Sequence, residues 1–323
     1  MKKKIALVQG GYSSEHEVSV KSAANVYSNI DKNLFDVYNV LLRPDSWSLE
    51  LDGDVVEIDK SDFSFVNNGS KVKFDLALIM IHGNPGENGL LQAYFELIGL
   101  KYTGCSSMVS SLIFDKFACK AFLASTSVNL AKDILLRKGD SFSVKEIIEN
   151  LGLPLFVKPN DGGSSFGITK VKKEEDLPKA IDDAFNEGET IILEEFISGR
   201  EMTCGVFAAD NKVKALPVTE IISDNEYFDY QAKYLGASKE ICPANISSSI
   251  FERIQEVTEK IYKYTGCKGI VRMDYIVRGE DVYFLEINPI PGMTNASLVP
   301  QQLRVANINI ENLFSKLIEE ALS

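Results

Sequence analysis

The stretch that decides the fold is residues 269–292, which read GIVRMDYIVRGEDVYFLEINPIPG. Two runs rich in apolar and β-branched residues, 271–277 and 282–287, predict two strands. The glycine-containing segment 279–281 between them predicts a three-residue hairpin loop. Because side chains alternate between the two faces of a strand, one face of this hairpin is expected to be polar. The core face is expected to carry Val271, Met273, Tyr275, Leu285 and Ile287.

The polar face of the hairpin gathers four functional side chains. A three-residue loop places Asp274 opposite Glu286 and Arg272 opposite Asn288. Two carboxylates and a carboxamide oxygen are hard ligands, suited to Mg²⁺ rather than to zinc. A solvated sheet face with a cross-strand ion pair is the alternative. The sequence Asn-Pro-Ile-Pro-Gly-Met-Thr that follows is unusual for an exposed edge, and it favours a site.

Composition limits the classes of protein to which the chain can belong. A chain of 323 residues suggests two or three domains, and its net charge of −12 argues against nucleic acid or an anionic membrane as the main partner. The five cysteines are scattered without zinc-ligand spacing, which predicts reduced thiols and a cytoplasmic protein. No apolar run is long enough for a signal peptide or a membrane span.

The N-terminal part of the chain has the pattern of an α/β domain. A strand at 5–8 is followed by a glycine-rich turn and a helix from 18 to about 30. The strand at 74–81 is almost entirely apolar, as an interior parallel strand should be. It ends at His82, at the edge of the sheet where ligands bind in such folds. A lone histidine is more often a structural hydrogen-bonding group, and this alternative stays open.

The middle of the chain carries a predicted anion-binding loop. Lys158 ends a strand, and the Gly/Ser-rich segment 162–167 that follows offers consecutive backbone N–H groups to an anion. The loop lacks the GK[ST] sequence of a Walker motif, so it is expected to be a hairpin lid over phosphates. Lys116 lies beside the apolar stripe of a helix capped by Ser106 or Ser107, where a solvated lysine is the alternative. Further helices are expected at 143–151, 250–264 and 310–322.

Nine short motifs occur in a characteristic order along the chain. They are Gly10-Gly11 with Glu15-His16-Glu17-Val18-Ser19; His82-Gly83 with Gly86-Glu87; Tyr102-Thr103-Gly104; Lys158-Pro159 with Gly163-Ser164-Ser165; Tyr230-Gln231-Ala232-Lys233-Tyr234; Cys242-Pro243-Ala244; Arg272-Met273-Asp274; Leu285-Glu286-Ile287-Asn288; and Pro291-Gly292-Met293-Thr294 with Ser297-Leu298. Taken together, these motifs resemble those of the D-alanine–D-alanine ligase family of ATP-grasp enzymes over essentially the full length.

The resemblance implies a fold and an activity. The fold would be an α/β (α+β) ATP-grasp architecture of three domains. Residues 1–104 would form an N-terminal parallel-sheet substrate domain, 105–197 a central lid domain and 198–323 a C-terminal antiparallel-sheet catalytic domain. The activity would be ATP-dependent ligation of two D-alanines through an acyl phosphate, for peptidoglycan synthesis. The resemblance also implies a cytoplasmic homodimer, without nucleic-acid or membrane partners.

The resemblance also implies roles for residues at matching positions. Two Mg²⁺ ions, for which Mn²⁺ can substitute, would be bound by Asp274, Glu286 and Asn288. ATP would be held by Lys116, Lys158, Gly163, Ser164, Ser165, Glu194, Glu195, Phe196, Ile197, Glu201 and Lys233. The first D-alanine would contact Glu15 and His82, with Ser164 and Tyr234 linking loop closure to its amine. Arg272 and the Gly292 N–H would form an oxyanion hole, and Ser297 and Leu298 would hold the second D-alanine.

Three departures from the common pattern of the family touch the edge of the site: Asn88, Pro289-Ile290 and Glu195-Phe196-Ile197. None of them removes a metal ligand or a phosphate-binding lysine. Three alternatives stay open: the same fold making D-alanyl-D-lactate or D-alanyl-D-serine, an ATP-grasp ligase for other substrates, and a nucleotide-binding regulator without turnover. Tyr234 favours D-alanine as the second substrate, whereas Glu15, Ser164 and Ser297 favour a dipeptide ligase.

Overall fold

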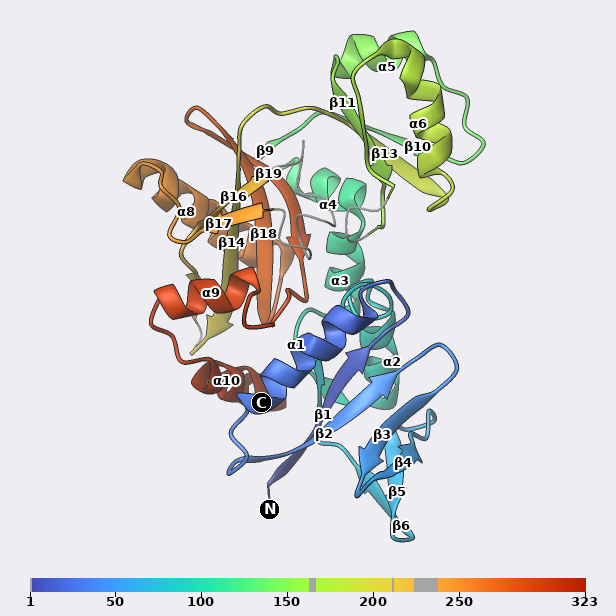
Figure 1. The fold of residues 1–323 in the computed structure, drawn as a ribbon, viewed down its shortest axis with the longest axis vertical. Coiled ribbons are helices and arrows are strands. Elements are labelled where there is room, and N and C mark those ends of the chain that lie inside the picture. Colours follow the sequence, from blue (N-terminus) through green and yellow to red (C-terminus); the bar gives the residue numbers. More distant parts are fainter. Residues whose placement is uncertain (1, 163–166, 211, 224–237) are drawn as a thin grey trace.

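The computed structural model describes residues 2–162, 167–210, 212–223 and 238–323. In this part of the chain, three larger β-sheets with their helices follow one another along the longest axis of the molecule (Figure 1). The N-terminal sheet lies at the bottom of that view, the C-terminal sheet in the middle and the sheet of the central segment at the top. No helix among the described residues is long and apolar enough to cross a membrane.

The N-terminal sheet has the strand order β4-β3-β2-β1-β7-β8. Strands β2, β1, β7 and β8 are mutually parallel, as predicted, but β3 and β4 run antiparallel at one edge. The predicted parallel sheet therefore has an antiparallel edge, because the connection from β2 to β3 is too short for a crossover. The bounds are β1 Lys3–Gly10, β2 Phe35–Leu42, β3 Trp47–Leu51, β4 Asp54–Glu57, β7 Leu76–Ile79 and β8 Lys101–Tyr102, with the separate hairpin β5 Ser64–Asn67 and β6 Ser70–Lys73 and the helices α1 His16–Ser28 and α2 Leu90–Ile98.

The central segment forms an antiparallel sheet in the order β10-β13-β11-β12. It encloses a hydrophobic core of its own, in which Leu155, Val157, Leu177 and Ile181 are fully buried. The predicted phosphate-binding loop connects β11 to β12, as expected from the sequence. The bounds are β10 Asp133–Arg137, β11 Leu155–Pro159, β12 Thr169–Val171, β13 Thr190–Glu195, α5 Val144–Leu151, a 3₁₀ turn at Glu174–Asp176 and α6 Leu177–Ala184.

The C-terminal sheet has the order β17-β16-β14-β18-β19-β9, with β15 also paired to β14. Its strands are antiparallel except for β9, which runs parallel to β19. Helix α8 ends at Gly266, whose φ of +74° closes the last turn as predicted. The bounds are β9 Asn129–Leu130, β14 Arg200–Ala209, β15 Lys212–Ala215, β16 Thr219–Ser223, β17 Ser238–Ile241, β18 Ile270–Arg278, β19 Asp281–Asn288, α8 Ser248–Thr265, α9 Leu298–Val305 and α10 Ile310–Leu322.

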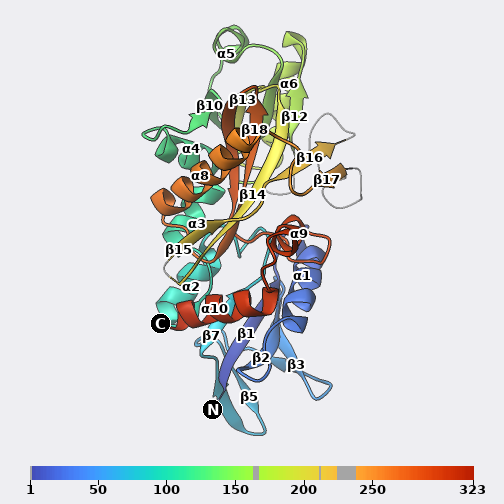
Figure 2. The same ribbon diagram turned by 90° about the vertical axis from the view of Figure 1, so that its left-hand side faces the viewer.

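The segment predicted as one helix beginning near Ser106 is two helices, α3 Ser107–Phe114 and α4 Lys116–Leu123. The break is at Asp115, which is extended and whose carboxylate accepts a hydrogen bond from the Ala118 N–H at 2.8 Å, capping α4. These helices pack into the core of the C-terminal sheet. Helix α10 packs against β7 and β8 of the N-terminal sheet and also against β14 of the C-terminal sheet (Figure 2). The predicted domain boundaries at 104 and 197 stay predictions, and the chain crosses between lobes more than once.

The hairpin formed by β18 and β19 confirms the predicted polar pairs, with Asp274 opposite Glu286 and Arg272 opposite Asn288. Its turn is one residue shorter than predicted, because Arg278 already pairs with Asp281. A β-bulge beside Asp274 takes up one extra residue of β19 and restores the predicted pairing.

The bulge also corrects the prediction for Leu285. This side chain was expected in the core, but it is half-buried and lines the cleft described below. Phe284 takes the core position beside it and is 1% exposed.

Candidate active site

A cleft of about 920 Å³ is lined by residues of the central and C-terminal sheets, by α1 and by the loops that follow strands of the N-terminal sheet. Every predicted site residue that lies in the described ranges lines this one cleft. These residues are Glu15, His82, Lys116, Lys158, Glu194, Glu195, Phe196, Ile197, Glu201, Arg272, Asp274, Glu286, Asn288, Gly292, Ser297 and Leu298. The other predicted site residues, Gly163, Ser164, Ser165, Lys233 and Tyr234, lie outside the described residues.

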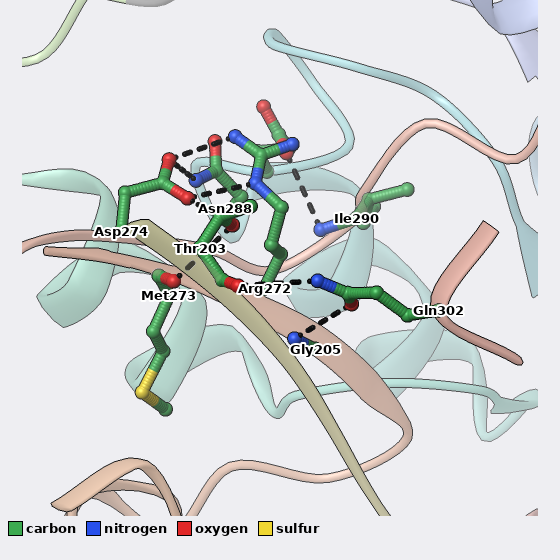
Figure 3. A network of polar contacts seen from close by, with 9 residues as sticks. Thr203, Gly205, Arg272, Met273, Asp274, Asn288, Ile290 and Gln302 are labelled. Carbon is green, nitrogen blue, oxygen red and sulfur yellow. Dashed lines mark hydrogen bonds and ion pairs between the residues drawn. The ribbon is translucent and has the colours of Figure 1, made fainter. Parts of the chain in front are cut away.

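Asp274 is the most densely bonded residue on the polar face of the hairpin. Its carboxylate accepts hydrogen bonds from Arg272 Nε at 2.9 Å and from an Arg272 terminal nitrogen at 2.8 Å. Thr203 Oγ1 donates to it at 2.6 Å and Asn288 Nδ2 at 3.0 Å (Figure 3). The bidentate arginine pair is the geometry that a guanidinium makes with a carboxylate. Asp274 is thus held rigidly, and it is only 4% exposed.

The donor set of the hairpin fits a hard divalent cation. Glu286 lies across from Asp274 and also lines the cleft, and Asn288 follows on the same strand. The candidate ligands are therefore two carboxylates and one carboxamide. Within the described ranges no group of three His, Cys, Asp or Glu side chains is arranged to hold a metal ion. A cation that binds Asp274 must compete with the donors from Arg272 and Asn288.

A buried ionic network stands at the end of the cleft formed by the central sheet. Glu194 forms ion pairs with Lys158 at 2.5 Å and with Lys120 at 2.7 Å, and Lys120 also pairs with Asp133 at 2.7 Å. Burial alone would raise the pKa of Glu194, but the two ammonium groups lower it to about 2. Lys116 Nζ donates to the Gly162 carbonyl at 2.6 Å, at the start of the predicted phosphate-binding loop. The cleft therefore presents two lysine ammonium groups where the sequence predicted contacts with phosphate.

Phe196, directly after β13, and Phe156 of β11 form an aromatic wall of the cleft. The rings of Phe196 and Phe156 have centroids 5.9 Å apart, and Lys170 Nζ lies 3.8 Å from the centroid of Phe196. Glu195 accepts a hydrogen bond from the Lys132 N–H at 2.8 Å, so its side chain is directed to the protein backbone. The apolar side chains of Leu285 and Phe156 both line the cleft, as a site for a flat base requires.

The opposite end of the cleft is formed by the N-terminal lobe, that is, the N-terminal sheet with α1, α2 and the loops between them. Glu15 lies directly before α1 and is 7% exposed. His82 Nδ1 lies 2.8 Å from the Ile290 carbonyl, and its Nε2 lies 3.1 Å from Ser22 Oγ. Burial lowers the pKa of His82, and Glu15 offsets part of this effect. The neutral ring therefore donates from Nδ1 to Ile290 and accepts at Nε2 from Ser22, so both of its nitrogens are engaged by protein groups.

Glu87 is a site residue to which sequence reasoning assigned no role. It is 8% exposed, and its carboxylate accepts hydrogen bonds from the Gly83 N–H at 2.8 Å and the Ile290 N–H at 3.3 Å. Burial and the neighbouring Glu15 raise the pKa of Glu87 to about 8. The sequence feature that could have indicated a role for Glu87 is its place among glycines, between a predicted strand and a predicted helix. The buried Lys120, Thr203 and the α1 residues that contact residues 290–293 gave no comparable signal.

The loop that ends the hairpin leaves no room for a side chain at Gly292. A Cβ atom there would lie 2.9 Å from Ser297 Oγ. The Ser297 hydroxyl is held by the Thr294 N–H at 3.1 Å and by Thr294 Oγ1 at 2.7 Å. Gln302 then anchors α9 to β14, since it accepts from the Gly205 N–H at 2.9 Å and donates to the Thr203 carbonyl at 3.2 Å (Figure 3). The start of α9, with Ser297 and Leu298, is thereby fixed against the cleft.

Comparisons with known proteins agree with this geometry. The family model for the N-terminus of D-ala D-ala ligase matches residues 4–105, and the model for its C-terminus matches residues 122–319. The D-alanine–D-alanine ligase of Phocaeicola vulgatus is 47% identical over 99% of both chains. The crystal structure of the VanG D-Ala:D-Ser ligase from Enterococcus faecalis has a TM-score of 0.89 at 32% identity, covering 99% of this chain and 100% of that one. The D-alanine–D-alanine ligase from Bacillus anthracis complexed with ATP has a TM-score of 0.80 at 28% identity, over 99% and 97%. The chain belongs to the D-alanine–D-alanine ligase family.

Proposed function

We propose that this chain joins two D-alanine molecules to D-alanyl-D-alanine, with conversion of ATP to ADP and phosphate, for peptidoglycan synthesis. Family membership and the relatives named D-alanine–D-alanine ligase support the proposal. The observation that carries it is the single cleft in which two carboxylates of the hairpin, Lys116 and Lys158, and Glu15 come together. An acyl-transfer enzyme driven by ATP needs all three kinds of group.

ATP is proposed to bind at the end of the cleft formed by the central sheet. The Bacillus anthracis relative was solved with ATP. In this chain Lys116 and Lys158 supply positive charge for the phosphates. The end of β13 and the residues that follow it, Glu194–Ile197, line the region expected to hold adenine and ribose, together with Glu201. The ion pair of Lys158 with Glu194 keeps that lysine ordered until phosphate competes for it. The contributions of Gly163, Ser164, Ser165 and Lys233 stay predictions from the sequence.

Magnesium is proposed to bind the polar face of the hairpin, with Asp274, Glu286 and Asn288 as ligands. When bound there, Mg²⁺ would neutralise charge on the β- and γ-phosphates, and Mn²⁺ would serve in the same way. The protein contributes ligands that are already ordered: Asp274 is oriented by Thr203 and Arg272 before any ion arrives. Binding would then require the cation to replace the donors from Arg272 and Asn288 at an Asp274 carboxylate that is already in place.

In the first step, the carboxylate of one D-alanine attacks the γ-phosphorus of ATP, which forms an acyl phosphate and releases ADP. Glu15 is proposed to bind the ammonium group of this D-alanine, because its carboxylate lies in the cleft wall close to His82. His82, whose nitrogens are occupied by Ile290 and Ser22, contributes by shaping this wall. The predicted parts of Ser164 and Tyr234 remain sequence-based.

In the second step, the amine of the other D-alanine attacks the acyl carbonyl, the amide bond forms, and phosphate leaves. The tetrahedral oxyanion is proposed to be met by Arg272 and the Gly292 N–H, both at the cleft. Loss of one such donor typically costs about 10²–10³ in rate. Ser297 and Leu298, held at the start of α9, are proposed to receive the second D-alanine, with its carboxylate near Ser297.

A second candidate is ligation of D-alanine to D-serine, because the VanG D-Ala:D-Ser ligase shares this fold at 32% identity. The test is phosphate release and product analysis with ATP, Mg²⁺ and either D-alanine alone, D-alanine with D-serine or D-alanine with D-lactate. We expect D-alanine alone to support full turnover and to yield D-alanyl-D-alanine. Turnover that required D-serine or D-lactate would overturn the assignment in favour of those substrates, and absence of turnover would favour a regulator.

A homodimer and the three-domain division at residues 104 and 197 are part of the same proposal. The division is supported by the central core, which is formed by residues of 136–193 only. Light scattering on the purified chain tests the dimer, and a mass of about 36 kDa, that of a single chain of 35.8 kDa, would contradict it.

A further inference from the structure

The loop that contains Gly292 is bonded through its backbone to side chains of the N-terminal lobe. Ile290 and Met293 each have both their N–H and their carbonyl group engaged in this way. The Ile290 N–H donates to Glu87 at 3.3 Å, and the Ile290 carbonyl accepts from His82 at 2.8 Å. The Met293 N–H donates to Ser22 Oγ at 3.1 Å, and the Met293 carbonyl accepts from Asn25 Nδ2 at 2.6 Å. Ile290 before the Gly292 amide and Met293 after it are therefore held at all four of their backbone polar groups.

The hydrogen bonds at Ser22 and His82 have one consistent direction. The carbonyl of Ile290 can only accept, so Nδ1 of His82 carries the proton. Nε2 of the neutral ring then accepts the proton of the Ser22 hydroxyl, whose oxygen accepts from the Met293 N–H. The bonds run from Met293 to Ser22, to His82 and back to Ile290. Such a chain orients every member, because reversal of one bond leaves a buried donor facing a donor.

Glu87 connects this arrangement to the loop after β7. One of its carboxylate oxygens accepts from the Ile290 N–H and the other from the Gly83 N–H. Ser22 and Asn25 lie one turn apart on α1, so they share a helix face. The support therefore comes from two independent elements of the N-terminal lobe, the helix α1 and the loop 82–87.

We propose that Ser22, Asn25 and Glu87 are positioning residues that set the direction of the Gly292 N–H toward the reacting carbonyl. This inference rests on the proposed function, in which that N–H stabilises the oxyanion of the second step. None of the three residues needs to touch the reacting atoms. A donor is effective only if it is aligned before charge develops, and a displacement of about 1 Å can cost about 10²-fold in rate.

The role predicts an imbalance between the two steps. Acyl phosphate formation does not use the oxyanion hole, so it should continue when the loop is loosened. Amide formation should slow, and the acyl phosphate that is left unattacked is hydrolysed to D-alanine and phosphate. Phosphate release should then exceed dipeptide formation. A variant that merely destabilised the fold would lower both products in parallel.

The experiment compares Asn25→Asp and Ser22→Ala with matched controls. Asn33→Asp, in the turn after α1, and Ser28→Ala, whose hydroxyl bonds only within α1, repeat the same chemical changes away from the loop. In Asn25→Asp a carboxylate faces the Met293 carbonyl and cannot donate. We expect dipeptide kcat to fall by about 10- to 100-fold with KM for ATP within about twofold of the parent. The ratio of phosphate to dipeptide should rise well above one, whereas both controls should keep a ratio of one.

Hydrogen exchange of the segment 288–297, followed by mass spectrometry, supplies a readout besides activity. We expect faster exchange in Ser22→Ala and Glu87→Gln than in the parent and in Ser28→Ala. Met293 loses its acceptor in the first variant, and in the second a carboxamide has one acceptor oxygen for the two N–H groups of Gly83 and Ile290. An unchanged ratio of phosphate to dipeptide, or unchanged exchange in folded variants, would overturn the proposal. A parent chain that releases phosphate but forms no dipeptide would refute the proposed function, and the exchange data would still show whether these residues hold the loop.

Discussion

The two ends of the cleft are built on different principles. At the end of the cleft that the central sheet forms, charged side chains pair with one another: Glu194 lies between Lys158 and Lys120. At the end of the N-terminal lobe, side chains such as Glu87 and Asn25 bind the backbone of a loop instead. The first arrangement can be exchanged by a charged ligand, since an ion pair can be replaced by another. The second is preorganised, since the backbone groups of the loop already have their partners before any substrate binds.

The largest expected effect concerns the ionic end. Lys120→Met removes one partner of a buried network and leaves Glu194 and Asp133 with less compensation. Truncation of one partner of a buried pair typically costs about 3–5 kcal/mol of stability. We expect a loss of this size in urea-induced unfolding at pH 7. Lys138→Met, which removes an exposed pair with Glu189, should cost less than about 1 kcal/mol. Equal losses in the two variants would contradict a dominant role for the buried network.

The next effect concerns the hairpin of β18 and β19, which lies between the two ends of the cleft. Arg272→Ala should lower kcat by about 10²–10³, because the developing oxyanion loses a donor. Nucleotide binding, measured by calorimetry with ADP, should be retained. Arg278→Ala, at the exposed end of the same strand, serves as the control. Near-normal dipeptide synthesis by Arg272→Ala would remove this guanidinium from the mechanism.

A smaller effect is expected for the cation. Asp274→Asn should raise the Mg²⁺ concentration for half-maximal activity by about 10- to 100-fold, since a charged ligand becomes neutral. The measurement is a Mg²⁺ titration at saturating ATP and D-alanine. Asp281→Asn, at the exposed start of β19, should leave the titration unchanged. If the Asp274→Asn titration coincides with that of the parent, the hairpin is not the metal site.

The smallest effect is a pH dependence of the preorganised end. The pKa of Glu87 in the folded chain is raised to about 8, through burial and the charge of Glu15. The folded state thus keeps a proton that the unfolded chain releases near pH 4.5. This contribution to stability is complete below pH 4.5, declines as pH rises and is gone above about pH 8.

The measurement is the free energy of unfolding between pH 6.5 and 8, where Glu87→Gln should remove a slope of at most about 1.4 kcal/mol per pH unit. The charged groups that act on Glu87 are Glu15 and Arg272, and His82 binds the carbonyl of the same Ile290 whose N–H binds Glu87. Burial lowers the pKa of His82 below 6.5, so this window separates the two groups. The control is Glu57→Gln on the exposed strand β4. If the free energy of unfolding changes with pH in the same way for the parent and Glu87→Gln, the carboxyl group of Glu87 does not titrate between pH 6.5 and 8.

Much of the site was predictable because its chemistry is local in the chain. The pairing of Asp274 with Glu286 follows from strand alternation, and it was correct although the loop length behind it was not. A shorter turn and a bulge shift the pairing in opposite directions, and the two shifts cancel at the polar face. The same bulge moved Leu285 out of the core, which no periodicity indicates.

The amino-acid sequence by itself determined the helix caps at Ser106 and Ser143, the parallel centre of the N-terminal sheet and the polar pairs on the hairpin. Ser106 and Ser143 each cap a helix by accepting a hydrogen bond from the N–H three residues later. Interactions of such short range are encoded by neighbouring residues, so they can be read from spacing alone.

Only the tertiary structure decided how the N-terminal lobe supports the catalytic loop. Asn25 and Met293 are 268 residues apart in the chain, and His82 and Ile290 are 208 residues apart. These contacts form only when α1 and the end of β19 are brought together by the packing of several lobes. Sequence periodicity carries no information about which distant backbone group a polar side chain will meet, because that depends on the closure of the whole chain.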